Sequence, residues 1–66
     1  MNYLLEALIK KLEGEVAMAK ANIKVYETNP AGIGEHPDVV QAVETQIEVI
    51  AGAEEKIETI RKHYGT

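Results

Sequence analysis

The chain has 66 residues with no cysteine, and its 7 basic residues against 11 acidic ones give a net charge of −4. Chains shorter than roughly 70–80 residues seldom bury enough apolar surface to fold alone, and usually add disulfides, a metal or a partner chain. The lack of cysteine excludes disulfides and thiolate metal sites, and the acidic balance argues against a nucleic-acid partner.

The first predicted element is a helix over residues 2–28. Its apolar residues recur at steps of four and three, the spacing of a helix that packs along one stripe; they are Leu5, Ile9, Leu12, Val16, Ala19, Ile23 and Tyr26. Asn2 suits the N-cap position. The helix should end near Thr28, because a residue that precedes proline, here Asn29, disfavours helical geometry. Leu4 and Leu8 widen the stripe beyond the width that one neighbouring helix covers.

Residues 29–37 are predicted to be the bend of a hairpin, in which prolines set the turns and glycines permit positive φ. The residues with this structural role are Pro30, Gly32, Ile33, Gly34 and Pro37. A phosphate-binding loop is one alternative, but no strand precedes it and Pro37 replaces the third glycine of the motif. A metal site formed by Glu35, His36 and Asp38 is another, although such residues are common where helices start. We expect no cofactor.

The second helix is predicted over residues 37–64. Pro37 suits the first helical position, which makes His36 the N-cap by position, and Gly65 suits the C-terminal cap. The apolar stripe consists of Val39, Val43, Ile47, Ile50, Ala53, Ile57, Ile60 and Tyr64. The short connection predicts two antiparallel helices, hence an all-α hairpin that forms a single domain.

The charges predict how the two helices pair. If the bend centres near Ile33, residues that face one another have numbers that sum to about 66. Glu6 then faces Arg61 and Lys62, and two groups of lysines in the first helix (Lys10 and Lys11; Lys20 and Lys24) face two groups of glutamates in the second (Glu54, Glu55 and Glu58; Glu44 and Glu48). Such complementarity sets the register of helical pairs. Gly14 falls opposite Gly52, which predicts a narrow waist.

Two helices side by side leave Leu4, Leu8, Val40 and Val49 in water. A second hairpin packed on that face would cover them, so we expect a homodimer that forms a coiled-coil four-helix bundle. The residues predicted at this oligomer interface are Leu4, Leu5, Leu8, Leu12, Val40, Val43, Ile47, Val49, Ile50, Ile57 and Ile60.

A second surface is predicted on the outer side of the first helix. Ala7, Gly14 and Ala21 repeat every seven residues there. Solvated helix faces are usually charged, so a stripe of small residues is a candidate docking surface for another protein. The alternative is that alanine is simply a good helix former.

Residues 20–62 resemble small uncharacterised proteins of T4-like phages of marine bacteria, whose hallmark is an "NPxGIGEHPD" bend like residues 29–38. The resemblance implies a phage protein of unknown role that acts in the infected cell or the virion, and it brings no catalytic residues. The architecture is also similar to Rop-type RNA-binding hairpins. That function needs a basic face, whereas the second helix has six acidic residues and three basic ones.

Catalysis needs a convergent pocket, but the chain has neither cysteine nor serine, and its two histidines lie far apart in the sequence. No run of about 18 apolar residues predicts a membrane span, and residues 1–15 lack the pattern of a signal peptide. The sequence therefore predicts a cytoplasmic, non-enzymatic hairpin that acts as a structural or adaptor module. The alternative is a small regulator that binds a host or phage protein through its small-residue face or its bend.

Overall fold

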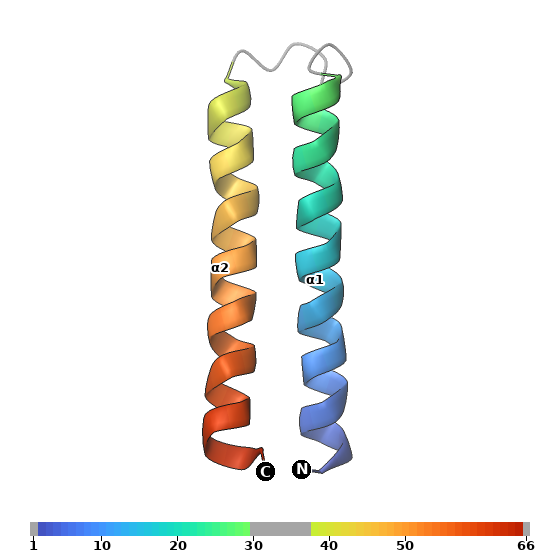
Figure 1. The fold of residues 1–66 in the computed structure, drawn as a ribbon, viewed down its shortest axis with the longest axis vertical. Coiled ribbons are helices and arrows are strands. Elements are labelled where there is room, and N and C mark those ends of the chain that lie inside the picture. The colour runs from blue at the N-terminus through green and yellow to red at the C-terminus, as the bar shows by residue number, and fades with distance from the viewer. Residues whose placement is uncertain (1, 30–37, 66) are drawn as a thin grey trace.

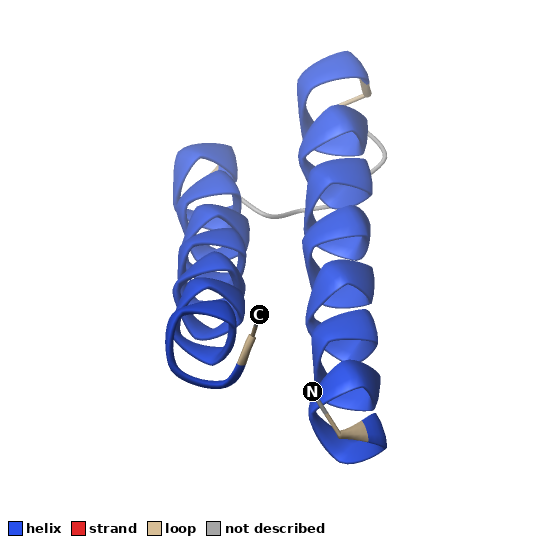
Figure 2. Ribbon diagram, turned by 60° about the horizontal axis from the view of Figure 1, so that its bottom comes forward, coloured by secondary structure: helices blue, strands red, loops and turns tan. Residues whose placement is uncertain are grey.

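The computed structural model describes residues 2–29 and 38–65, which form two α-helices of 26 residues each. Helix α1 spans Tyr3–Thr28 and helix α2 spans Val39–Tyr64. The helices run antiparallel and side by side, so that both ends of the chain lie at one end of a rod of 45 × 15 × 14 Å (Figure 1). A second view shows the same pairing (Figure 2). The predicted all-α antiparallel hairpin is confirmed, whereas the predicted bend residues Pro30, Gly32, Ile33, Gly34 and Pro37 lie outside the described residues.

Side-chain caps define where each helix begins. The Asn2 carboxamide oxygen accepts a hydrogen bond from the Leu5 backbone N–H over 2.9 Å, as predicted for an N-cap. In α2 the N-cap is Asp38, whose carboxylate accepts from the Gln41 backbone N–H over 2.8 Å. The prediction that His36 caps a helix starting at residue 37 is therefore wrong by two residues. Asp38 takes the N-cap position because aspartate is among the strongest N-cap residues and histidine is not.

Gly65 ends α2, and the need for glycine there is steric. Its backbone is extended, with φ −85° and ψ 160°, so the left-handed conformation common at helix C-termini is not used. A Cβ atom at this position would lie 2.6 Å from the Arg61 carbonyl oxygen, closer than real Cβ contacts allow. Any larger residue would force the last turn to shift.

The hairpin core is small and lies toward the end of the rod that holds both chain termini. Its buried cluster joins the first half of α1 to the last half of α2 and consists of Ile9, Leu12, Ala53, Ile57 and Ile60, with Leu5 and Val16 packed against it. Ala19 is the one further buried apolar residue among those described. Nearer the bend, Ile23, Tyr26, Val39 and Val43 are only half-buried. Packing between the helices is therefore strongest far from the bend.

One layer of the apolar stripe of α2 differs from the prediction. Ile47 was predicted on the packed stripe, but its side chain is 51% exposed. Gln46 is half-buried in its place, and its Oε1 accepts a hydrogen bond from Asn22 of α1 over 3.2 Å. Tyr64, at the end of the predicted stripe, is also exposed. The apolar spacing predicted the stripe by residue type, and a polar pair occupies one of its layers.

The predicted facing sum of about 66 agrees with the Asn22–Gln46 contact, whose numbers sum to 68, but the expected charge pairs and the glycine waist are wrong. Among the described residues, the ion pair that crosses between the helices joins Glu13 to Arg61, with 3.9 Å between the charged atoms, and the predicted pairings form none. Lys10 and Lys11 pair instead within α1, with Glu13 and Glu15. A Cβ atom placed on Gly14 or Gly52 would meet no atom within 4 Å, so neither glycine marks a close approach of the helices.

Candidate interaction surfaces

The residues predicted at an oligomer interface fall into three groups in the hairpin. Leu12, Ile57 and Ile60 are buried in its own core, where they contact the other helix of the same chain. Three are half-buried between the helices: Leu5, Val43 and Ile50. Five are exposed: Leu4, Leu8, Val40, Ile47 and Val49. The exposed group is the part of the prediction that a second molecule could cover.

Two grooves run between the helices on opposite sides of the hairpin, each with a volume of about 420 Å³. One is lined by Leu8, Gly52, Glu55, Lys56, Thr59 and Ile60, and we call that surface of the hairpin the Leu8 side. The other is lined by Glu13, Val16, Glu54, Ile57, Glu58 and Arg61, and we call that surface the Glu13 side. Because the volumes are equal, only the lining chemistry distinguishes the two grooves.

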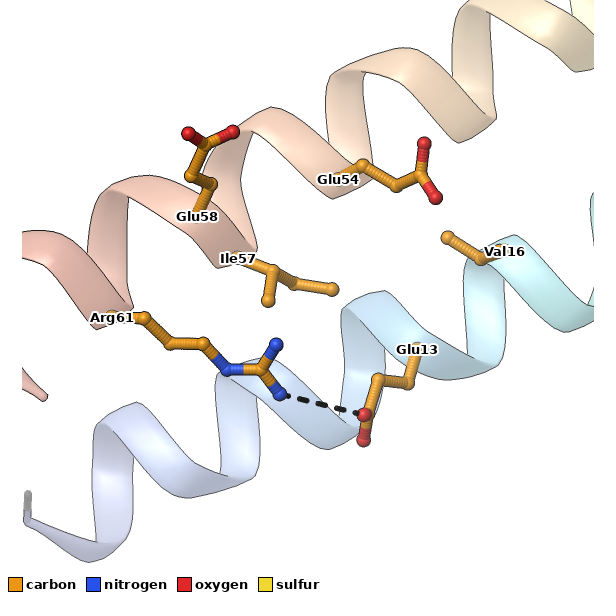
Figure 3. Close-up of a pocket in the computed structure, with 6 residues that line it drawn as sticks. All are labelled: Glu13, Val16, Glu54, Ile57, Glu58 and Arg61. Atoms are coloured by element: carbon orange, nitrogen blue, oxygen red, sulfur yellow. Dashed lines mark ion pairs between the residues drawn. The ribbon is translucent and has the colours of Figure 1, made fainter.

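The groove on the Glu13 side is acidic (Figure 3). Val16 and Ile57 reach between the helices from α1 and α2, while Glu54 extends from α2 toward Val16 and Glu58 points away from α1. Arg61 reaches across to Glu13, and the two side chains, 62% and 48% exposed, form the ion pair between the helices. Three carboxylates and one guanidinium leave this groove with an excess of negative charge.

Val40 and Val49 lie on opposite sides of α2. They are nine residues apart, about two and a half turns of an α-helix. Val49 shares the Leu8 side with Gly52 and Lys56 through spacings of three and seven, whereas Val40 and Ile47 share the Glu13 side with Glu54 through spacings of fourteen and seven. One hairpin packed on one face therefore cannot cover Leu4, Leu8, Val40 and Val49 together, and the prediction that it would is wrong.

Ala7, Gly14 and Ala21, predicted as a docking stripe, are all exposed on α1. Met18 and Val25 follow Gly14 and Ala21 by four residues, one helical turn further on, and are 69% and 49% exposed. The small-residue stripe thus borders large apolar side chains. Val25 is absent from the predicted sites, although it shares its heptad position with Leu4 and Met18, and that spacing was the available signal.

The metal-site alternative finds no support among the described residues. Within residues 2–29 and 38–65, no group of three or more His, Cys, Asp or Glu side chains is arranged to hold a metal ion. Asp38 of the metal alternative is engaged as a helix cap, and Glu35 and His36 lie outside the described residues. Neither α1 nor α2 is long and apolar enough to cross a membrane.

Comparison of the chain with protein-family models, with curated proteins and with solved structures found no match.

Proposed function

We propose that this chain is a non-enzymatic helical hairpin that self-associates into a four-helix bundle and acts as a structural or adaptor module. The observation that carries the proposal is the amount of apolar side chain that the hairpin leaves in water. Nine large apolar residues are exposed among those described, against six apolar residues that are buried, two of them alanines. Burying one large aliphatic side chain stabilises a fold by roughly 1.5–3 kcal/mol, so a second molecule on this surface would add a large part of the total.

The size of the hairpin supports the same proposal. One face of the rod is 45 Å long and about 15 Å wide. The area of such a face is comparable with the roughly 800 Å² that each partner contributes to a standard protein interface. Chains of this length without disulfides commonly obtain the missing core from a partner chain. The partner proposed is therefore a second copy of the chain, and the role is to hold or join, not to catalyse.

Sedimentation equilibrium or light scattering tests the proposal. We expect a mass of about twice the 7.3 kDa of one chain at micromolar concentration, with a melting temperature that rises with protein concentration because the dimer is favoured by mass action. A folded species at the mass of one chain, with a melting temperature independent of concentration, would contradict self-association and with it the proposed function.

A second candidate function is a small regulator that binds another protein through the α1 stripe of Ala7, Gly14 and Ala21. The observation that favours it is that all three are exposed and that a Cβ atom on Gly14 would meet nothing within 4 Å, so a partner backbone has room to approach. Replacing Gly14 and Ala21 together with glutamate should leave the mass of the oligomer unchanged while it abolishes binding of the regulated protein. Unchanged binding would remove this candidate.

The setting proposed for either function is the cytoplasm of an infected cell or the virion, and the resemblance of residues 20–62 to small phage proteins supports it. A Rop-like function is not favoured, because the groove on the Glu13 side has three carboxylates, which repel phosphates.

A further inference from the structure

The charged side chains of the two helices are distributed unequally around the hairpin. Helical spacing from the residues that line each groove places eleven of the sixteen on the Glu13 side: Glu6, Lys10, Glu13, Lys20, Lys24, Glu27, Glu44, Glu54, Glu58, Arg61 and Lys62. The Leu8 side has five: Lys11, Glu15, Glu48, Glu55 and Lys56. Both sides have a net charge of −1 (six acidic against five basic residues, and three against two), so they differ in the number of charges and not in their sum.

Large exposed apolar residues have the opposite distribution. Four lie on the Leu8 side: Leu4, Leu8 and Met18 of α1, and Val49 of α2. Two lie on the Glu13 side, namely Val40 and Ile47. Val25 and Tyr3 share the helical positions of Ala7 and Ala21 on the outer side of α1, and Tyr64 lies at the end of α2. The side with fewer charges is therefore also the side with more uncovered apolar surface.

Several polar groups of the Leu8 side have partners within the same chain. Lys11 forms an ion pair with Glu15 at 3.3 Å, one turn further along α1. The hydroxyls of Thr45 and Thr59 donate to the backbone carbonyls of Gln41 and Glu55, over 3.1 and 2.9 Å. A polar group that already has its hydrogen bond costs much less to remove from water than one that does not.

The Glu13 side has more charged side chains without a partner. Its ion pairs involve Lys10, Glu13 and Arg61. The other eight form no ion pair with another described residue: Glu6, Lys20, Lys24, Glu27, Glu44, Glu54, Glu58 and Lys62. Three on the Leu8 side form none either: Glu48, Glu55 and Lys56. Covering the larger set would remove more charges from water without compensation, which is expensive.

We infer that the second copy packs on the Leu8 side, and that the Glu13 side faces water in the dimer. This inference rests on the proposed self-association and names the surface that performs it. A two-fold symmetric interface brings the same patch of both copies together, so the side with fewer unpaired charges and more exposed apolar surface loses less by contact with itself. Val40 and Ile47 then remain outside the interface.

Matched glutamate substitutions test the inference. Met18→Glu and Val40→Glu each add one negative charge at an exposed helix residue, 69% and 80% exposed in the single hairpin. We expect Met18→Glu to raise the dimer dissociation constant at least about 100-fold, because it buries a carboxylate without a partner, and Val40→Glu to change it less than about threefold. Val49→Glu and Ile47→Glu form a second pair with the same expected contrast.

The outcomes separate the inference from the proposal on which it rests. A wild-type chain with the mass of one copy overturns both. If the wild-type chain is a dimer, three results overturn the inference and leave self-association standing. They are dissociation by Val40→Glu alone, dissociation by both substitutions, and dissociation by neither. Circular dichroism establishes whether each variant is still helical.

If Met18→Glu unfolds the chain, thiol labelling of single-cysteine variants replaces the glutamate test. The chain has no cysteine, so Met18→Cys and Val40→Cys each introduce a single thiol. Reaction with a maleimide in the native dimer should be at least about tenfold slower at residue 18 than at residue 40, because a thiol in an interface is inaccessible. Equal rates, or slower reaction at residue 40, overturn the inference.

Discussion

Asn22 of α1 donates a hydrogen bond from its carboxamide nitrogen to Oε1 of Gln46 in α2, across 3.2 Å between the helices. This polar pair lies between the well-packed cluster near the chain ends and the half-buried residues nearer the bend. The pair is exposed, so water can replace either partner and the hydrogen bond itself contributes little to stability. It marks the register in which Gln46 faces α1, while Ile47, about 100° further around the helix, is directed away.

Replacing Gln46 with leucine tests this register. Leucine at a half-buried seam position adds apolar contact, so we expect Gln46→Leu to raise the free energy of unfolding by up to about 1 kcal/mol. Ile47→Ala should change it by less than about 1 kcal/mol, since half of that side chain is already in water. Urea denaturation at fixed protein concentration measures both. A loss of 2 kcal/mol or more with Ile47→Ala would mean that Ile47, and not Gln46, faces α1.

Leu12 is the most informative core residue, because only 2% of its surface is exposed. Leu12→Ala should lower the free energy of unfolding by about 2–5 kcal/mol, the usual cost of a cavity at a buried leucine. Tyr3→Ala is the control, at a side chain 77% exposed on the same helix, and should change it by less than about 0.5 kcal/mol. Equal losses in chemical denaturation would show that α1 packs through a different face.

The start of α2 depends on one side chain, Asp38. Asp38→Ala removes the acceptor for the Gln41 backbone N–H and should destabilise the hairpin by about 0.5–2 kcal/mol. Asp38→Asn keeps an acceptor oxygen and should retain most of that stability. Thermal unfolding followed by circular dichroism compares the two variants. If Asp38→Ala melts at the wild-type temperature, α2 begins at another residue.

Two glycines should respond in opposite directions to the same substitution. Gly14→Ala adds a methyl group where nothing lies within 4 Å, and it should stabilise α1 by up to about 1 kcal/mol through helix propensity. Gly65→Ala places its methyl group 2.6 Å from the Arg61 carbonyl oxygen, and it should fray the end of α2 and lower the melting temperature. A loss of stability with Gly14→Ala would instead reveal a molecule packed closely against that residue.

The helix pair was predictable from sequence, but the details of its surfaces were not. Runs of apolar residues at steps of three and four, bounded by Asn2 and Gly65, are sufficient for two helices and their antiparallel order. The predicted charge pairs do not form because exposed ion pairs contribute only about 0–1 kcal/mol, which is too little to compete with packing. Lysines such as Lys11 found a closer partner one turn away in their own helix.

The sequence identified which apolar residues are candidates for the interface, but not the direction in which each side chain points. Leu12, Ile57 and Ile60 were assigned to a partner contact, but the other helix of the same chain already covers them. Val40 and Val49 were assigned to one face, although nine residues of helix are two and a half turns and place them on opposite sides of the helix axis. Both errors come from treating a broad apolar stripe as one surface when two helices divide it into an inner seam and two outer sides.

The position of the best-packed cluster has a consequence for how the chain acquires its shape. Ile9 and Ile57 belong to the same buried cluster, yet most of the chain separates them in sequence. The contacts that stabilise the hairpin therefore require a long loop to close. On a ribosome, α1 would emerge with its apolar stripe uncovered, and it would remain so until residues 53–60 of α2 had been made. At that stage the nascent chain is most open to capture by chaperones or proteases.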